Sequence, residues 1–265
     1  MRLLITNTGL VNPLLPVYNP SDAELSVAAL NPAVWAIGTA SYIKNGLLQK
    51  VSALANRVNG SLFNAVTGLE PVTASNAAGV IGINFSGANG LIGDTAVIQD
   101  ANINSYAFLI KLPSGALSSS PSQRVVIATS DASFMGVGIN TTGSGSYPVI
   151  FRAGTTNQLA FTGLNMGTTA QFAVVIISVN VTTSTCRAIW KTATGTGNQT
   201  AVSQALVAYQ TSNKFNIGAG LADGSSSVFA SIIAEALFFP GLYLGGTTAE
   251  TTVLNYLYAK VAGLS

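Results

Sequence analysis

Short apolar segments rich in Val, Ile and Phe alternate along this chain with polar clusters of Gly, Ser, Thr and Asn. Apolar runs bounded by such turn-forming residues are typical of β-strands. Strands are expected at residues 80–85, 106–112, 124–129, 134–139, 148–152, 172–181, 185–191, 214–218 and 228–239. Many short strands joined by turns favour an all-β fold, either an antiparallel β-sandwich or a jelly roll.

Two of these strands carry a further prediction about burial. Residues 172–181 are apolar on both faces, so this strand should lie at the centre of a sheet that is covered on both sides. Cys186, the lone cysteine, shares one strand face with Ala188 and Trp190. This placement predicts a small buried hydrophobic side chain and not a reactive thiol.

A helix is expected at about residues 247–262, after the last strand. Thr247 and Glu250 match the capping box, in which the threonine oxygen accepts an amide hydrogen bond and the glutamate reaches back. The apolar face of this helix consists of Val253, Leu254, Leu257, Tyr258 and Val261. We therefore expect the helix to pack onto the sandwich.

The first 32 residues differ in character from the sandwich that we assign to residues 33–265. Prolines interrupt this segment repeatedly, which disfavours a continuous helix or a central strand. Its apolar residues are nevertheless too numerous for a solvated tail; the candidates for an anchor are Leu3, Leu4, Ile5, Leu14, Leu15 and Val17. Two arrangements would bury them: an extended N-terminal arm that lies on a neighbouring subunit, or an edge strand added to the chain's own sheet.

Charged residues are scarce, at 8% of 265 residues, whereas an ordinary soluble domain carries about 25%. So few ionic groups indicate that other protein covers much of the surface. The 11 basic residues are scattered singly, which argues against a nucleic-acid partner. No apolar run approaches the roughly 20 residues of a membrane-spanning helix, so no membrane partner is expected.

The residues that enzymes use for catalysis are few. The chain has no histidine, which excludes a Ser-His-Asp arrangement, and no two of its nine acidic residues share a predicted strand face. Asp22 and Glu24 stand two residues apart, but in the Pro-rich N-terminal segment. Glu235, inside an apolar strand, could be a general acid with a raised pKa, but a buried glutamate that ties a loop or helix end is the favoured interpretation. The loop residues Asp94, Asp100, Asp131 and Asp223 lack the spacing of a calcium site. We expect no enzymatic activity, no cofactor and no metal.

Sugar binding without a metal needs an exposed aromatic ring flanked by amide side chains. Tyr147 and Tyr209 lie near loops rich in Gly and Asn, and Phe134 has a similar setting. Tyr147 and Tyr209 are therefore the candidate glycan contacts.

Several short motifs follow one another along the chain in an order that matches a known domain family. Ile217-Gly218 precedes Ile233-Ala234-Glu235 and then Tyr256-Leu257-Tyr258-Ala259-Lys260. Upstream stand Trp35, Asn59-Gly60, Glu70-Pro71 and Phe85-Ser86-Gly87. Over residues 33–263 this order resembles concanavalin A-like lectin/glucanase domains, in the laminin-G-like form found in tailed-phage structural proteins. The resemblance implies structural roles for Trp35, Pro71, Phe85, Gly87, Gly218, Glu235, Tyr256, Leu257 and Lys260.

The same resemblance implies a function in assembly. It indicates a non-enzymatic virion structural protein of a bacteriophage, in capsid decoration or a head or tail appendage, assembled in the host cytoplasm and anchored by the N-terminal arm. Its partners would be further copies of itself, with a trimer as one symmetric closure, and other virion proteins. The alternative is a carbohydrate-binding adhesion module on the virion surface that recognises a host glycan.

Overall fold

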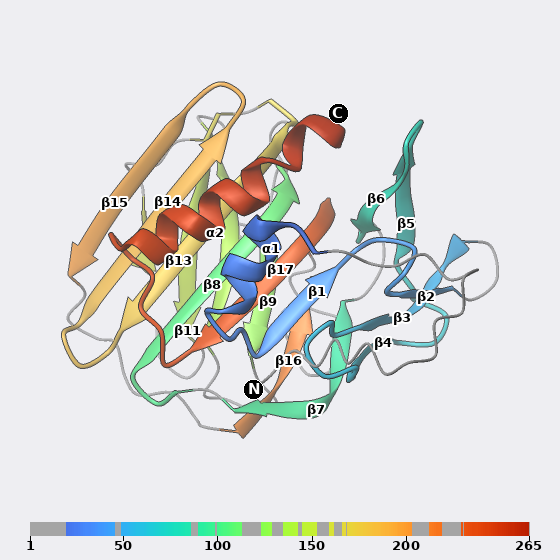
Figure 1. The fold of residues 1–265 in the computed structure, drawn as a ribbon, viewed down its shortest axis with the longest axis horizontal. Coiled ribbons are helices and arrows are strands. Elements are labelled where there is room, and N and C mark those ends of the chain that lie inside the picture. The colour runs from blue at the N-terminus through green and yellow to red at the C-terminus, as the bar shows by residue number, and fades with distance from the viewer. Residues whose placement is uncertain are drawn as a thin grey trace.

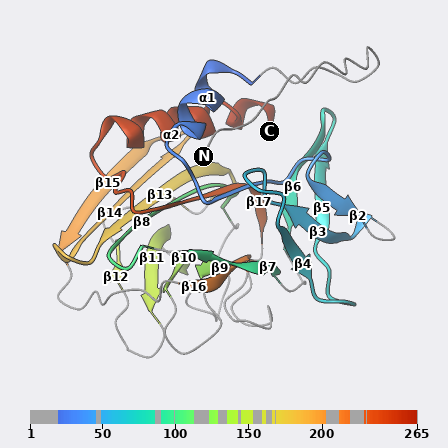
Figure 2. The same ribbon diagram turned by 60° about the horizontal axis from the view of Figure 1, so that its bottom comes forward.

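The computed structural model describes residues 20–45, 49–85, 90–98, 100–112, 123–128, 135–142, 145–152, 159–161, 166–167, 169–202, 212–218, 229 and 231–264. Two antiparallel β-sheets pack face to face, and two helices cover the outer face of one of them (Figures 1 and 2). This arrangement confirms the predicted antiparallel β-sandwich with a C-terminal helix.

The sheet that carries the helices, here called sheet A, has eight strands. Their order is β15-β14-β13-β8-β17-β6-β5, and β1 also pairs with β17. These strands are β1 (Val34–Ile37), β5 (Val72–Asn76), β6 (Gly79–Asn84), β8 (Ile103–Lys111), β13 (Phe172–Asn180), β14 (Thr185–Thr192), β15 (Thr196–Val202) and β17 (Ile232–Pro240).

The opposite sheet, sheet B, has nine strands in the order β12-β11-β10-β9-β16-β7-β4-β3-β2. They are β2 (Ile43–Asn45), β3 (Val51–Ala55), β4 (Leu62–Ala65), β7 (Leu91–Ile98), β9 (Gln123–Ala128), β10 (Met135–Thr142), β11 (Gly145–Arg152), β12 (Leu159–Ala160) and β16 (Ser212–Ile217). Each of the nine strands expected from the sequence overlaps one of the strands in these two sheets, so those predictions are confirmed.

Strand β13 occupies the central position that its sequence predicts. It lies between β8 and β14, and alternate side chains enter two cores. Val175 and Ile177 face the core between the sheets, whereas Val174 and Ile176 face the helices. The core between the sheets also holds an aromatic group: the Phe238 ring lies 5.0 Å from Tyr106 and 5.2 Å from Phe215, between ring centroids.

Cys186 is completely buried in the core between the sheets, as predicted. Burial raises the pKa of its thiol well above the ordinary value, so the reactive thiolate is scarce. We expect the native chain to resist iodoacetamide at pH 8 and to take up one label, on its single cysteine, after unfolding in guanidinium. The exposed Thr196→Cys variant is the control and should react at once. Rapid labelling of the native wild-type chain would contradict this burial.

Helix α2 (Thr248–Tyr258) begins where the sequence predicts a cap. The Thr247 Oγ1 accepts a hydrogen bond from the Glu250 amide at 3.3 Å. The reciprocal half of the predicted box is wrong, because the Glu250 carboxylate accepts instead from the Gly246 amide, at 3.0 Å, and from Arg187. Among its apolar residues, Val253, Leu254 and Leu257 are buried, and the helix gives way to a short 3-10 turn at Val261–Gly263.

Helix α1 (Asp22–Ala28) corrects part of the predicted N-terminal arm. Residues 20–32 are not extended, since Ser21 and Glu24 form a complete capping box and Val27 is buried against α2. Prolines stand at positions 20 and 32, where they flank the helix without interrupting it. Residues 1–19, with the anchor candidates Leu3, Leu4, Ile5, Leu14, Leu15 and Val17, lie outside the described residues, and their role stays a prediction. Among the helices of the described residues, none has the length and apolarity to cross a bilayer.

Candidate functional site

Glu235, on β17, lies at the centre of a buried polar network under the helices. The side chain is 2% exposed. Its Oε1 accepts hydrogen bonds from Trp35 Nε1 at 2.7 Å and from the Tyr256 hydroxyl at 2.8 Å, and its Oε2 lies 2.6 Å from Lys260 Nζ. These contacts agree with the interpretation of a glutamate that ties down a helix.

The environment of this network keeps Tyr256 in its neutral form. Burial, followed by the negative charge of Glu235, raises the pKa of Tyr256 far above its ordinary value. The hydroxyl therefore remains a donor to the carboxylate, while the Lys260 ammonium contacts the same hydroxyl. The Glu235 carboxylate is thus held by three donors, which come from β1, α2 and the segment after α2.

Trp35 connects the network to helix α1. The Arg57 guanidinium lies 4.3 Å above the Trp35 ring, and the Tyr256 ring meets it edge-on at 5.7 Å. Arg57 also pairs with Glu24 of α1 at 2.9 Å. One continuous set of contacts thus ties α1, β1, β17 and α2 together, which makes this network a structural element.

The other motif residues that the structure describes make backbone or packing contacts within the sandwich. The Pro71 carbonyl accepts from the Val51 amide at 2.7 Å, and Leu257 is fully buried in the helix layer. Gly218 has φ +79° and lies directly against the ring of the buried Phe85. Gly87 lies outside the described residues.

The glutamates of the chain are all used in ion pairs. Besides Glu235 and Glu24, Glu250 pairs with Arg187 at 3.0 Å and Glu70 with Lys50 at 3.3 Å. Hydrogen bonds from backbone amides, foremost near Gly68, and the Lys50 charge lower the pKa of Glu70. Within the described ranges, no His, Cys, Asp or Glu side chains cluster as metal ligands would.

Of the four loop aspartates that the sequence raises as calcium candidates, two lie among the described residues. Asp100 accepts hydrogen bonds from the amides of Asn102 and Ile103 and so closes a turn. Asp94 is exposed on β7, and Asp131 and Asp223 lie outside the described residues.

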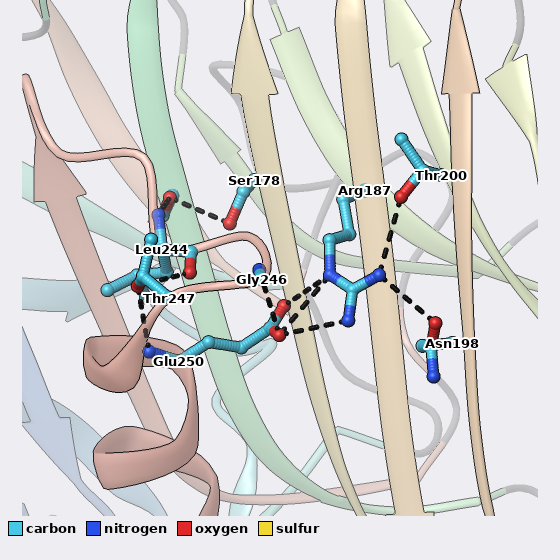
Figure 3. Close-up of polar contacts among 9 residues, drawn as sticks. Ser178, Arg187, Asn198, Thr200, Leu244, Gly246, Thr247 and Glu250 are labelled. Carbon is cyan, nitrogen blue, oxygen red and sulfur yellow. Dashed lines mark hydrogen bonds and ion pairs between the residues drawn. The ribbon is translucent and has the colours of Figure 1, made fainter.

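A second polar group, centred on Arg187 of β14, lies on the outer face of sheet A (Figure 3). The guanidinium makes a fork-like pair with the Glu250 carboxylate: Nε lies 3.0 and 3.2 Å from its two oxygens, and Nη2 lies 3.1 Å from one of them. Its Nη1 donates to Asn198 Oδ1 at 3.0 Å and to Thr200 Oγ1 at 3.3 Å. Arg187 therefore links the first turn of α2 to two exposed side chains of β15.

A half-buried tyrosine borders this group. A Cβ placed on Gly245 would lie 2.8 Å from the Tyr243 ring and 2.9 Å from Arg187 Cδ, so both side chains lie against Gly245. Burial raises the pKa of Tyr243 above its ordinary value, which keeps its hydroxyl neutral. We call Arg187, Asn198, Thr200, Tyr243 and Glu250 the Arg187 site. It presents an aromatic ring, an amide and a hydroxyl with no net charge.

Of the candidate glycan residues taken from the sequence, Tyr147 lies in the other sheet, on β11 of sheet B and opposite Asn140 of β10. Tyr209 and Phe134 lie outside the described residues. The sequence contains no clear signal for the Arg187 site, since its strand, Thr185–Thr192, also carries Lys191 and two threonines.

Comparisons with known proteins identify similar solved structures, whereas no protein-family model and no curated protein sequence matches this chain. The binding domain of botulinum neurotoxin serotype D aligns with a TM-score of 0.54 and 11% identity, over 88% of this chain and 53% of that one. Basic winged bean lectin, solved with Tn-antigen, aligns at 0.40 and 14% identity, over 77% and 95%. The enzymatically active domain of bacteriophage CBA120 tailspike protein 2 aligns at 0.49 and 11% identity, over 71% and 29%. This chain thus spans about half the length of the botulinum domain, and that likeness agrees with the β-sandwich architecture.

Proposed function

We propose that this chain is a non-catalytic carbohydrate-binding module, and that the Arg187 site contacts the glycan. The single observation that carries this proposal is the pair of exposed neutral groups, on Asn198 and Thr200, that one guanidinium holds in place, while the stem of the same arginine and Tyr243 both lie against Gly245. A sugar ring can lie on an aromatic face while its hydroxyls bond to amide and hydroxyl groups, and this site offers both.

The charge balance of the site defines the class of glycan. Arg187 and Glu250 neutralise each other, and the guanidinium already has partners at Nε, Nη1 and Nη2. An anionic ligand would have to compete with a buried carboxylate for this cation. A neutral, hydroxyl-rich glycan meets no such competition, so we infer that the ligand is neutral.

The position of the site on the fold supports access to a ligand. Asn198 and Thr200 are exposed on β15, beyond the strip of sheet A over which α2 lies (Figure 1). The likeness to the botulinum binding domain supports the sandwich alone, and the ligand class rests on the side chains of this chain.

A glycan array, followed by calorimetry on the strongest hit, tests the proposal. We expect Tyr243→Ala and Asn198→Ala each to weaken binding about tenfold, which corresponds to the loss of about one stacking or hydrogen-bond contact. Tyr147→Ala, on β11 of sheet B, is the matched control and should bind as the wild-type chain does. Loss of binding in Tyr147→Ala or Tyr209→Ala, with Tyr243→Ala and Asn198→Ala unchanged, would move the site to the residues expected from sequence. An array without reproducible signal, or sugar release from the bound glycan, would contradict the proposal.

Assembly within a phage virion is the second candidate function, and the scarcity of charge favours it. A surface with so few ionic groups suits permanent protein contacts, which are less charged than transient ones. Residues 1–19 would then serve as the anchor and virion proteins as partners. The glycan array separates the two functions, because assembly alone gives no glycan signal.

A further inference from the structure

Strand β15 forms one end of sheet A, and within the described part of the chain no strand pairs with its far side (Figures 1 and 2). It runs from Thr196 to Val202 and pairs with β14 without a register shift. An edge of this kind presents a row of backbone donors and acceptors that another strand can use.

The turn before β15 shows which backbone groups face outward. The Thr192 amide donates to the Gly195 carbonyl at 2.8 Å, so these two residues form a hydrogen-bonded pair. Such pairs alternate along an antiparallel ladder. Gly197, Gln199 and Ala201 therefore bond to β14, and the outward backbone groups belong to Thr196, Asn198, Thr200 and Val202.

The other ends of the two sheets carry features that discourage pairing with another chain. At the opposite end of sheet A, β5 follows Pro71 and has a register shift between Ala74 and Ser75. In sheet B, β2 has three residues, includes Lys44 and has a register shift, and β12 has two residues. Strand β15 has seven residues without charge, proline or bulge. It is therefore the unprotected edge among these four.

We propose that β15 is a dimerisation edge, which pairs antiparallel with β15 of a second copy of this chain and joins the two A sheets into one. The register that uses the outward groups of both strands places Asn198 opposite Thr200 of the second copy, and Thr196 opposite Val202. Each such pair exchanges two hydrogen bonds. Gln199 then lies on the two-fold axis, and the contact closes after two copies because it is isologous.

Charge favours a second copy of this chain as the occupant. The side chains of β15 are neutral, so a two-fold axis brings no like charges together. On β14, Arg187 is neutralised by Glu250, and the Lys191 ammonium lies 4.0 Å above the Tyr258 ring of α2. This inference does not depend on the proposed glycan binding, since it uses the backbone of β15.

Light scattering on the size-separated full chain tests the dimer. We expect a mass of twice the 27.0 kDa chain at micromolar concentration. Thr200→Pro removes an outward amide and should raise the dimer dissociation constant at least about tenfold, which corresponds to about 1.4 kcal/mol. Thr200→Val keeps the amide and should remain a dimer. A wild-type chain of single mass at all concentrations would overturn the proposal, as would a dimer that survives this proline. Should Thr200→Pro fail to fold, Thr196→Pro at the end of the strand replaces it with the same expectations.

A cysteine placed on the proposed axis tests the register. Residues that face each other across a non-hydrogen-bonded pair have Cα atoms about 4.5 Å apart, within the range of a disulfide. Gln199→Cys should therefore form a covalent dimer under mild oxidation, and Thr194→Cys, in the exposed turn before the strand, should not. Equal cross-linking of both variants, or of the wild-type chain through Cys186, would contradict this register.

Discussion

Glu235→Ala is expected to lower the free energy of unfolding by about 3 to 5 kcal/mol. The change removes the acceptor of three donors, and two of them, Trp35 Nε1 and the Tyr256 hydroxyl, are buried. A buried donor left without a partner costs about 1 to 3 kcal/mol. Lys260 is one-third exposed, at 32%, so its ammonium can turn toward water and adds little to this cost. Chemical denaturation followed by circular dichroism measures the loss.

Two control variants separate the acceptor from the charge. Glu235→Gln keeps an oxygen for the buried donors and loses the pair with Lys260, so we expect a loss of about 1 to 2 kcal/mol. Asp94→Ala removes an exposed acid and should stay within about 0.5 kcal/mol of the wild-type chain. If Glu235→Ala were as stable as Asp94→Ala, the network would not hold the helices.

The scarcity of charge in this chain has a structural counterpart. Three of the four glutamate ion pairs tie the helix layer to the rest of the chain. Glu235 of sheet A pairs with Lys260, just after α2, Glu250 of α2 pairs with Arg187 of sheet A, and Glu24 of α1 pairs with Arg57. The charges of each pair neutralise each other within the molecule, and the carboxylates are largely buried. The pairs therefore add little net charge to the faces on which the two proposals rest.

The buried strands could be predicted because they are continuous runs of apolar residues. Strands β13 and β17 are apolar at nearly every position and lie between two cores. Strands β2 and β12 are too short to show a periodic pattern of apolar residues. Strand β15 is polar at its outer positions, so its sequence does not indicate a buried strand. The conformation of these strands is fixed by pairing with neighbouring strands, which a local sequence pattern does not reveal.

The sequence likewise predicts only part of each candidate site. Glu235 could be identified because an acid inside an apolar strand needs partners. Its partners Trp35 and Tyr256 lie 200 and 21 residues away, which no local pattern reveals. The Arg187 site joins β14, β15 and the turn before α2, and only the folded chain brings these segments together. Helix α1 is hidden in the sequence because the prolines on either side of it indicate breaks in an extended segment.

Gly218→Ala should lower the free energy of unfolding by about 2 to 4 kcal/mol, for two separable reasons. At φ +79° an alanine costs about 1 to 2 kcal/mol. Its Cβ would also lie 2.5 Å from the ring of Phe85, and such overpacking costs about 1 to 3 kcal/mol. Thermal and urea unfolding of the variant measure the combined loss.

Gly60→Ala is the matched control, because Gly60 has φ +76° and no atom within 4 Å of the added Cβ. It should show the backbone cost alone, so the difference between the two variants measures the contact with Phe85. The double variant Gly218→Ala with Phe85→Leu should then lose less stability than the sum of its single changes, since the smaller side chain gives the Cβ room. Equal losses for Gly218→Ala and Gly60→Ala, with additive behaviour in the double variant, would mean that the Phe85 ring moves aside. The glycine would then be required at position 218 for its backbone conformation only, and any residue tolerant of positive φ, such as asparagine, should replace it at little cost.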